Sequence, residues 1–398
     1  MIGGRAKTGL AWAVVPFLLI GFGIVGYLFW VDWQNAASRD GLLINNSTLW
    51  GRDFVNVWSG GRMLLAGDLG ALYDIEAYQA WQAANLDAGI DHHNYSYPPT
   101  SLLYAWTFAS LPYVTALFTW LGLSAIAFVA AARPWLKDAA IAAPWALLLP
   151  TTALCLWAGH YGLFFGALWL WAWREVDNDP RTAGIATALM IIKPHLAILM
   201  PLLFALKGAW RAFAWAALAL GALVGLSIAI FGAGLWETYL TSTSGTQLGL
   251  VDNTNAFFAR MMTGTVTNML AAGATPAVAW GAQIAVALVA LVLVARLPRD
   301  AASLCFGGAI ATFLILPYGF NYDLTVVGLA ALLLAHHAWR SGERPRFLIA
   351  GLALALPPAM IFLGREAIYP APLILLALLF LAGTRRPAAF APTKLQSA

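Results

Sequence analysis

The chain has 398 residues, of which 61% are hydrophobic and only 10% are charged. Soluble domains carry about 25% charged residues, so this composition excludes a protein whose whole surface faces water. The formal net charge of +4 comes from basic loops beside apolar segments and does not indicate a nucleic-acid partner. Apolar runs recur without strand-like alternation. We therefore predict an all-α polytopic membrane protein, because helices in lipid satisfy their own backbone hydrogen bonds.

The apolar runs predict a bundle of about 10–12 transmembrane or half-membrane helices. They lie at about residues 9–30, 99–132, 139–157, 161–173, 182–194, 195–206, 212–232, 276–297, 301–317, 322–338, 347–363 and 369–384. The first run is too long for a signal-peptide core, so we expect a retained span. Segment 99–132 is long and contains Pro112, which predicts either a kinked span or a span plus a piece in the membrane plane.

Basic residues predict the orientation of the chain. With the N-terminus inside, 16 of the 22 lysine and arginine residues fall in inside segments, as the positive-inside rule requires. Both termini are then cytoplasmic. Residues 1–384 form a single transmembrane domain, and residues 385–398 form a short cytoplasmic tail. Two large loops, at about 31–98 and 233–275, lie outside.

The first outer loop is predicted to contain amphipathic helices that lie on the membrane surface against the bundle. Residues 53–66 would place Phe54, Trp58 and Leu65 on one side of a helix. Residues 73–88 would form a second helix.

Three polar turns open outward between short apolar segments. Segments 182–194 and 195–206 are too short to cross a core about 30 Å thick. Their junction at Lys193-Pro194-His195 therefore implies a dip of the outer surface into the bundle. The turns at Gly159-His160-Tyr161-Gly162 and at 317–323 are similar. Broken helices are tolerated only where they are buried in protein or line a wet cavity.

Ionisable residues of the outer side are the candidate site residues. Lys193 and Asp323 are costly near the membrane core unless they are paired or functional, and a structural Lys–Asp pair is the alternative. His160 and His195 are either bundle histidines or site residues. Asp53 begins a predicted loop helix, where the alternative is a carboxylate that caps the helix.

An ordered set of motifs runs from about residue 50 to residue 325. It includes Gly51-Arg52-Asp53-Phe54, Gly60-Gly61-Arg62, Tyr97-Pro98-Pro99, Gly159-His160-Tyr161-Gly162, Lys193-Pro194-His195 and Tyr322-Asp323-Leu324. This set resembles glycosyltransferase family 87, whose members are membrane enzymes of the GT-C type. Family members commonly have Gly-Gln-Asn-Gly and Lys-Pro-Gln at the fourth and fifth motifs, and an Asp is frequent where Asn321 stands.

The resemblance implies a GT-C-type domain and a polyprenyl-phosphate-sugar-dependent glycosyltransferase. It would move a sugar, mannose being the first choice, to a lipid or glycan acceptor on the periplasmic face of a bacterial inner membrane. In GT-C enzymes an acidic residue of the first outer loop is the general base, and Asp53 matches that place. We expect a single inverting displacement, which needs one essential carboxylate.

The candidate substrate-binding residues supply cations, aromatic rings and polar groups. The groups available for the departing phosphate are Arg52, Arg62, Lys193, His160 and His195. The other motif residues are Tyr97, Tyr161, Asn321, Tyr322 and Asp323. No metal-ligand cluster is visible in the sequence, so we expect no cofactor and a metal-independent reaction. The expected partners are the lipid-linked sugar, the acceptor and membrane lipids.

Two other functions stay open at this point. Broken helices at mid-depth also occur in transporters, which allows a transporter or a flippase for lipid-linked sugars. The altered fourth and fifth motifs allow a non-catalytic subunit of a membrane assembly.

Overall fold

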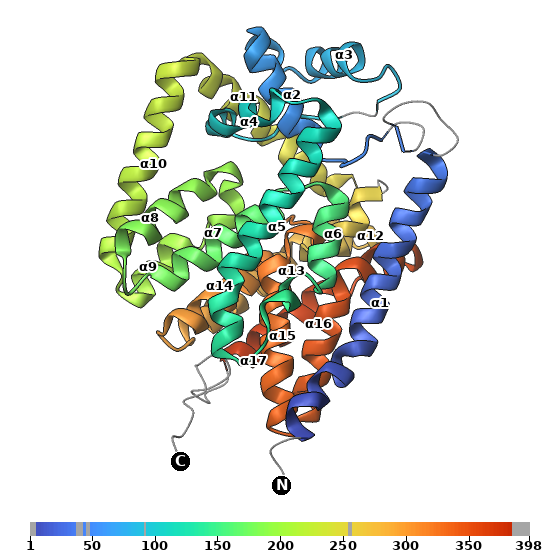
Figure 1. The fold of residues 1–398 in the computed structure, drawn as a ribbon, viewed down its shortest axis with the longest axis vertical. Coiled ribbons are helices and arrows are strands. Elements are labelled where there is room, and N and C mark those ends of the chain that lie inside the picture. Colours follow the sequence, from blue (N-terminus) through green and yellow to red (C-terminus); the bar gives the residue numbers. More distant parts are fainter. Residues whose placement is uncertain (1–4, 37–42, 45–47, 91–92, 254–256, 384–398) are drawn as a thin grey trace.

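The structure is a computed structural model that describes residues 5–36, 43–44, 48–90, 93–253 and 257–383. Within these ranges the chain folds into helices, and its only extended pairings are the isolated bridges Leu43–Leu49 and Met262–Phe320. The start of α1 and the end of α17 lie at the same end of the molecule (Figure 1). The predicted tail, 385–398, lies outside the described residues.

In the part of the chain that the structure describes, five helices are long and apolar enough to cross a membrane. They are α1 (Arg5–Ala36), α5 (Tyr113–Asp138), α10 (Trp210–Phe231), α13 (Pro276–Ala295) and α16 (Arg344–Leu363). A helix of 20 residues is about 30 Å long, the thickness of the hydrocarbon core. Only 6% of the apolar window of α10 is buried inside the protein, and so large an apolar surface needs lipid around it. The protein is an all-α polytopic membrane protein, as predicted.

Shorter helices pack among and beside these spans. They are α6 (Pro150–Ala158), α7 (Gly162–Glu175), α8 (Pro180–Leu189), α9 (Met200–Lys207), α14 (Ala301–Ile315), α15 (Thr325–Arg340) and α17 (Ala371–Gly383). Helices α14 and α15 are buried along most of their length. Small residues allow this close packing: Gly308 of α14 lies against Leu203, and Gly328 of α15 lies against Thr151.

A layer of helices covers one end of the bundle, at the top of Figure 1. It contains α2 (Phe54–Ala66), α3 (Ile75–Asn85), α4 (Leu102–Ala109) and α11 (Ala233–Asp252). Helix α12 (Thr265–Ala271) follows α11 and packs against α13. Both predicted helices of the first outer loop are present, as α2 and α3. Of the three residues predicted to share one side of α2, Phe54 and Trp58 are buried, whereas Leu65, near the end of the helix, is 52% exposed.

The predicted segment 99–132 consists of two pieces. Helix α4 belongs to the covering layer, where it packs against α2, and α5 is a candidate span. Pro112 lies at the boundary and caps the start of α5, because proline suits the start of a helix but not its interior. Short 3-10 turns join the helices: η1 (Leu69–Ala71), η2 (Pro99–Ser101), η3 (Ala143–Ala146), η4 (Met190–Ile192), η5 (Pro194–Ala197), η6 (Phe257–Met261), η7 (Asn321–Asp323) and η8 (Gly364–Glu366).

Candidate active site

The start of α2 is joined to the end of α6. Helix α6 ends at Gly159, whose φ of +66° is a left-handed conformation that glycine adopts without strain. The Asp53 N–H donates to the Ala158 carbonyl at 3.1 Å. A Cβ atom at position 159 would overlap the Gly51 carbonyl, so this close approach requires glycine. Asp53 and His160 are thereby brought together from distant parts of the chain.

A break in the backbone places Lys193 in the interior. Lys193 lies between η4 and η5 with φ −136° and ψ 73°. Its neighbour Pro194 disfavours the helical conformation for the residue before it, so the helical run that starts with α8 stops there. The Lys193 side chain is only 6% exposed. The break therefore lies inside protein, as expected for an interrupted helix.

Lys193, Asp323 and His160 form a buried ionic cluster. The Lys193 ammonium donates to Asp323 Oδ2 at 2.7 Å and lies 3.2 Å from His160 Nδ1. Asp323 Oδ1 lies 3.5 Å from the same ring nitrogen. An ammonium group only donates hydrogen bonds, so Nδ1 accepts and the proton of a neutral imidazole is on Nε2. The Nε2–H donor of His160 therefore points away from Lys193.

Asp53 lies on the far side of the His160 ring. Its Oδ2 atom is 3.8 Å from His160 Nε2. The Asp53 side chain is 29% exposed, whereas that of Asp323 is fully buried. Asp53 occupies the N-cap position of α2, but its carboxylate makes no capping hydrogen bond. The capping role that the sequence allowed is therefore not observed, and this carboxylate is within reach of a substrate.

Two tyrosines hold the His160 ring. Its Nε2 atom is 3.1 Å from the Tyr97 hydroxyl, and its face stacks on Tyr322 with ring centroids 4.6 Å apart. These two contacts hold the orientation of the imidazole, and with it the direction of Nε2 toward Asp53.

Arg52 belongs to a second ion pair, whose acid the sequence analysis missed. Its guanidinium donates to Asp32 at 2.7 Å and lies 4.0 Å from the centre of the Trp157 ring. The Trp157 indole N–H also donates to Asp32, at 2.8 Å. Asp32 lies beyond the predicted end of the first span, but α1 continues to Ala36. The position of Asp32 directly after an apolar run was the sequence signal that could have identified it as a site residue.

Arg62 and Asn321 have partners outside the ionic cluster. Arg62 is exposed and lies over the Trp58 ring, 4.9 Å from its centre. It is nine residues beyond Asp53, which is about 13 Å along a helix. The Asn321 amide donates to the Pro357 carbonyl at 2.6 Å. The structure thus does not gather these two predicted substrate-binding residues with Asp53.

Tyr161 and His195 lie next to the cluster rather than in it. The Tyr161 ring is fully buried and packs edge-on against Tyr97, with centroids 4.7 Å apart. The His195 ring packs against Tyr318 at 5.4 Å. Both contribute to the walls around the ionic cluster. Among the described residues, no group of three or more His, Cys, Asp or Glu side chains is placed to hold a metal ion.

The fold and the site define a polytopic membrane protein with a buried Lys–His–Asp cluster beneath its covering layer and a second, partly exposed carboxylate beside it. A family model described as glycosyltransferase family 87 matches residues 95–317, more than half of the chain. The chain belongs to this family, which indicates a membrane glycosyltransferase. No curated protein and no solved structure matches it. The family match includes Tyr97, His160 and Lys193, and it excludes Asp53 and Asp323.

Proposed function

We propose that the protein transfers a sugar from a polyprenyl-phosphate donor to a hydroxyl group of a lipid or glycan acceptor, with Asp53 as the general base. The position of Asp53 supports this most directly. Its carboxylate is 29% exposed and lies 3.8 Å from His160, which Lys193 and Asp323 contact from the other side. A substrate-accessible carboxylate beside preorganised polar groups suits proton abstraction.

The proposed reaction is a single displacement. Asp53 accepts the proton of the acceptor hydroxyl while the acceptor oxygen bonds to the anomeric carbon. The bond between that carbon and the phosphate oxygen breaks, and its electron pair leaves with the phosphate. Attack opposite the leaving group inverts the anomeric centre, so one essential carboxylate is enough.

Arg52 is the cation that we assign to the leaving phosphate. Its side chain is 18% exposed, compared with 6% for Lys193. A guanidinium can contact two phosphate oxygens at once, and the contacts with Asp32 and Trp157 orient it before the substrate arrives. Lys193 is already held by Asp323 and His160, so we assign it the positioning of the imidazole.

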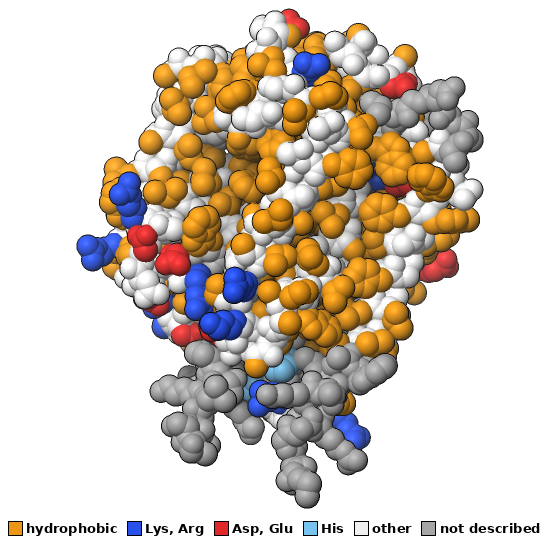
Figure 2. Space-filling model, in the orientation of Figure 1, with side chains coloured by type: hydrophobic (Ala, Val, Ile, Leu, Met, Phe, Trp, Pro, Cys, Tyr) orange, Lys and Arg blue, Asp and Glu red, His pale blue; other side chains and the backbone are white. Residues whose placement is uncertain are grey.

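We place the site on the periplasmic side of a bacterial inner membrane. Figure 2 shows most of the visible lysine and arginine side chains in the lower half of the molecule, with a broad hydrophobic surface above them. Basic residues favour the cytoplasmic side. The start of α1 and the end of α17 lie at that lower end (Figure 1), so the layer of α2, α3, α4 and α11 would face the periplasm.

The test compares two aspartates of the same loop. Asp53→Asn is expected to lower kcat about 10²–10⁴-fold, the usual contribution of a general base. Asp68→Asn is the matched control, because Asp68 is exposed and makes no capping hydrogen bond. Both variants are assayed in detergent with a panel of polyprenyl-phosphate hexoses that starts with mannose. Full activity of Asp53→Asn would refute the proposal.

A transporter or flippase for lipid-linked sugars is the second candidate, and the break at Lys193 favours it. Micelles separate the two functions because they hold no gradient and no second compartment. Product formed in micelles supports the transferase. Donor movement across vesicles without any product supports the flippase. Donor binding that is absent for every sugar in the panel would instead support a non-catalytic assembly subunit.

A further inference from the structure

Two arginines from distant parts of the chain lie next to each other at the end of α16. Arg365 follows α16 directly, in η8, and is exposed, whereas Arg260 lies in η6 and is half-buried. The stem of Arg260 packs against Gly364, where an added Cβ atom would lie 2.9 Å from the Arg260 Cβ. Neighbouring Cα atoms are about 3.8 Å apart, so Arg260 and Arg365 both start close enough to reach a single ligand.

The charge of these two arginines is not balanced by the protein. In the predicted topology 16 of the 22 lysine and arginine residues fall inside, and these two are among the six that fall outside. Neither forms an ion pair or a side-chain hydrogen bond with any residue that the structure describes. Glu366 is exposed and pairs with neither. Neighbouring like charges repel and basic residues are disfavoured on the outer side, so an anion would stabilise this place.

An aromatic belt lies at the same level of the bundle. The Arg365 guanidinium lies 5.2 Å from the centre of the Phe362 ring, and Phe362 packs edge-on against Tyr27 of α1, with centroids 5.7 Å apart. Tyr27, Trp30 and Trp33 are three residues apart, so they lie on one side of α1, and they are 43%, 56% and 62% exposed. Tyrosine and tryptophan gather at membrane–water interfaces. The belt therefore places Arg365 at the level of the lipid headgroups.

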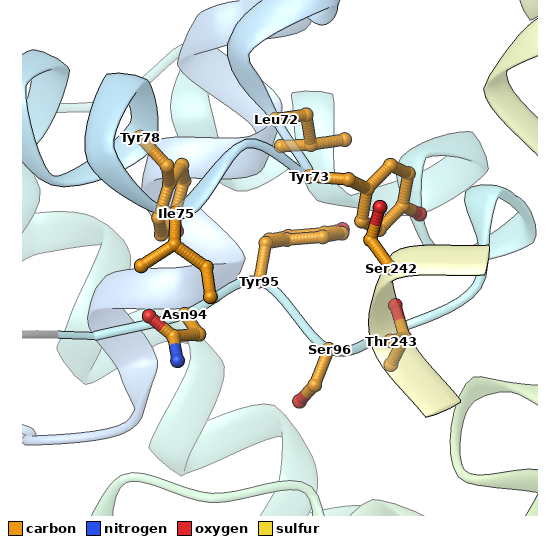
Figure 3. Close-up of a pocket in the computed structure, with 9 residues that line it drawn as sticks. All are labelled: Leu72, Tyr73, Ile75, Tyr78, Asn94, Tyr95, Ser96, Ser242 and Thr243. Atoms are coloured by element: carbon orange, nitrogen blue, oxygen red, sulfur yellow. The ribbon is translucent and has the colours of Figure 1, made fainter. Parts of the chain in front are cut away.

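The covering layer offers no comparable place for an anion. Figure 3 shows a pocket there, in which the Tyr95 ring lies between Ile75 and Tyr73. None of the nine side chains that line this pocket carries a formal charge at neutral pH. A phosphate binds best to cations, so the two arginines suit it and this pocket does not.

We propose that Arg260 and Arg365 bind the phosphate of an anionic phospholipid of the surrounding bilayer. A guanidinium can contact two phosphate oxygens at once. Ile20 lies two turns before Tyr27 on the same side of α1 and is 54% exposed, so this side offers apolar surface to the acyl chains. The arginines lie beside the lipid-facing belt rather than beside Asp53, which favours a bilayer lipid over the sugar donor. The inference goes beyond the transferase proposal and does not depend on Asp53.

The test measures lipid binding by native mass spectrometry on the delipidated protein in detergent. The probes are phosphatidylglycerol, diacylglycerol, which has no phosphate, and polyprenyl phosphate. The main variant is Arg260→Gln with Arg365→Gln. The matched control is Arg62→Gln, because Arg62 is exposed and also lies over an aromatic ring, 4.9 Å from the centre of Trp58.

The wild type and Arg62→Gln are expected to bind phosphatidylglycerol at least about tenfold more tightly than diacylglycerol. The double variant is expected to lower the affinity for phosphatidylglycerol about tenfold to a hundredfold, the range that follows from losing charge-assisted hydrogen bonds, and to leave that for diacylglycerol unchanged. Arg365→Lys keeps the charge but loses the paired contact, so we expect a loss of about threefold to tenfold. If the double variant fails to fold, Arg365→Gln alone replaces it, because that side chain is exposed.

Three results would overturn the proposal. One is equal affinity for phosphatidylglycerol in the wild type and the folded double variant. Another is full displacement of phosphatidylglycerol by excess inorganic phosphate, which would show a site for free phosphate instead of a lipid. The third is tighter binding of polyprenyl phosphate together with a donor KM that rises in the double variant as much as in Arg52→Gln, because the arginines would then belong to the donor site.

Asp53→Asn separates this inference from the transferase proposal. This variant is expected to bind phosphatidylglycerol as the wild type does, since Asp53 is not part of the lipid site. Full transfer by Asp53→Asn would refute the general base and leave the lipid site to be judged by the arginine variants. Loss of phosphatidylglycerol binding in Asp53→Asn would place the lipid at the ionic cluster and refute the arginine site.

Discussion

The region around Asp323 and the region around Asp53 each contain an aspartate, and the two carboxylates lie in opposite environments. Asp323 is fully buried and paired with Lys193 at 2.7 Å. Asp53 is 29% exposed and makes no capping hydrogen bond. His160 lies between them and contacts both. This difference is the basis of the proposed roles, because a buried, paired carboxylate stabilises and positions its neighbours, whereas an accessible one can exchange a proton with a substrate.

The ion pair of the inner region gives the largest expected effect. Lys193→Met leaves the Asp323 carboxylate buried without a cation, and breaking such a pair costs about 3–5 kcal/mol. We expect a lower midpoint of thermal unfolding in detergent and loss of transfer. The double variant Lys193→Met with Asp323→Leu should recover most of the stability, because it removes both charges, but not the activity. An unchanged midpoint in Lys193→Met would contradict the pairing.

The junction between the two regions is tested by glycine substitution. Gly159→Ala places a Cβ against the Gly51 carbonyl at a φ of +66°, and we expect about 2–4 kcal/mol of destabilisation from strain and overpacking. Gly67→Ala is the control, because Gly67 has a φ of +81° but open space around it. It should cost only the strain, about 1–2 kcal/mol. Equal unfolding midpoints for the two variants would show that the close approach has no energetic role.

The arginines test whether the outer region holds the phosphate. Arg52→Gln is expected to raise the donor KM about tenfold to a hundredfold, the range that follows from losing a charge-assisted hydrogen bond. Arg62→Gln should leave it unchanged, because Arg62 lies over Trp58 on the exposed side of α2. Donor titrations at saturating acceptor measure both. A larger effect at Arg62 than at Arg52 would reverse the assignment.

The smallest expected effect belongs to the hydroxyl that contacts His160. Tyr97→Phe removes the group 3.1 Å from Nε2 and keeps the ring contacts. One hydrogen bond contributes about 0.5–1.5 kcal/mol, so we expect a kcat lowered about twofold to tenfold and a nearly unchanged unfolding midpoint. Thermal unfolding and steady-state kinetics on the same preparation check both. A loss as large as that of Asp53→Asn would give the tyrosine a direct part in proton transfer.

Much of the fold was predictable because its causes are local. Apolar runs predicted a helical membrane protein, and Pro194 after Lys193 predicted the break between α8 and α9. The boundaries differed in two places: segment 99–132 is α4 and α5, and α1 continues past the predicted end of the first span. Periodicity put Leu65 on the same side of α2 as Phe54 and Trp58, but Leu65 is 52% exposed, since periodicity does not show which part of a helix meets other helices.

The sequence by itself determined the class of protein, the helices and the short set of polar residues from which a site could be built. The tertiary structure decided how these residues pair. Lys193 and Asp323 are 130 residues apart and Arg52 and Asp32 are 20 apart, and no local preference links either pair. Burial also distinguishes Asp53 from Asp323, because the solvent exposure of a side chain depends on neighbours that only the folded chain brings together.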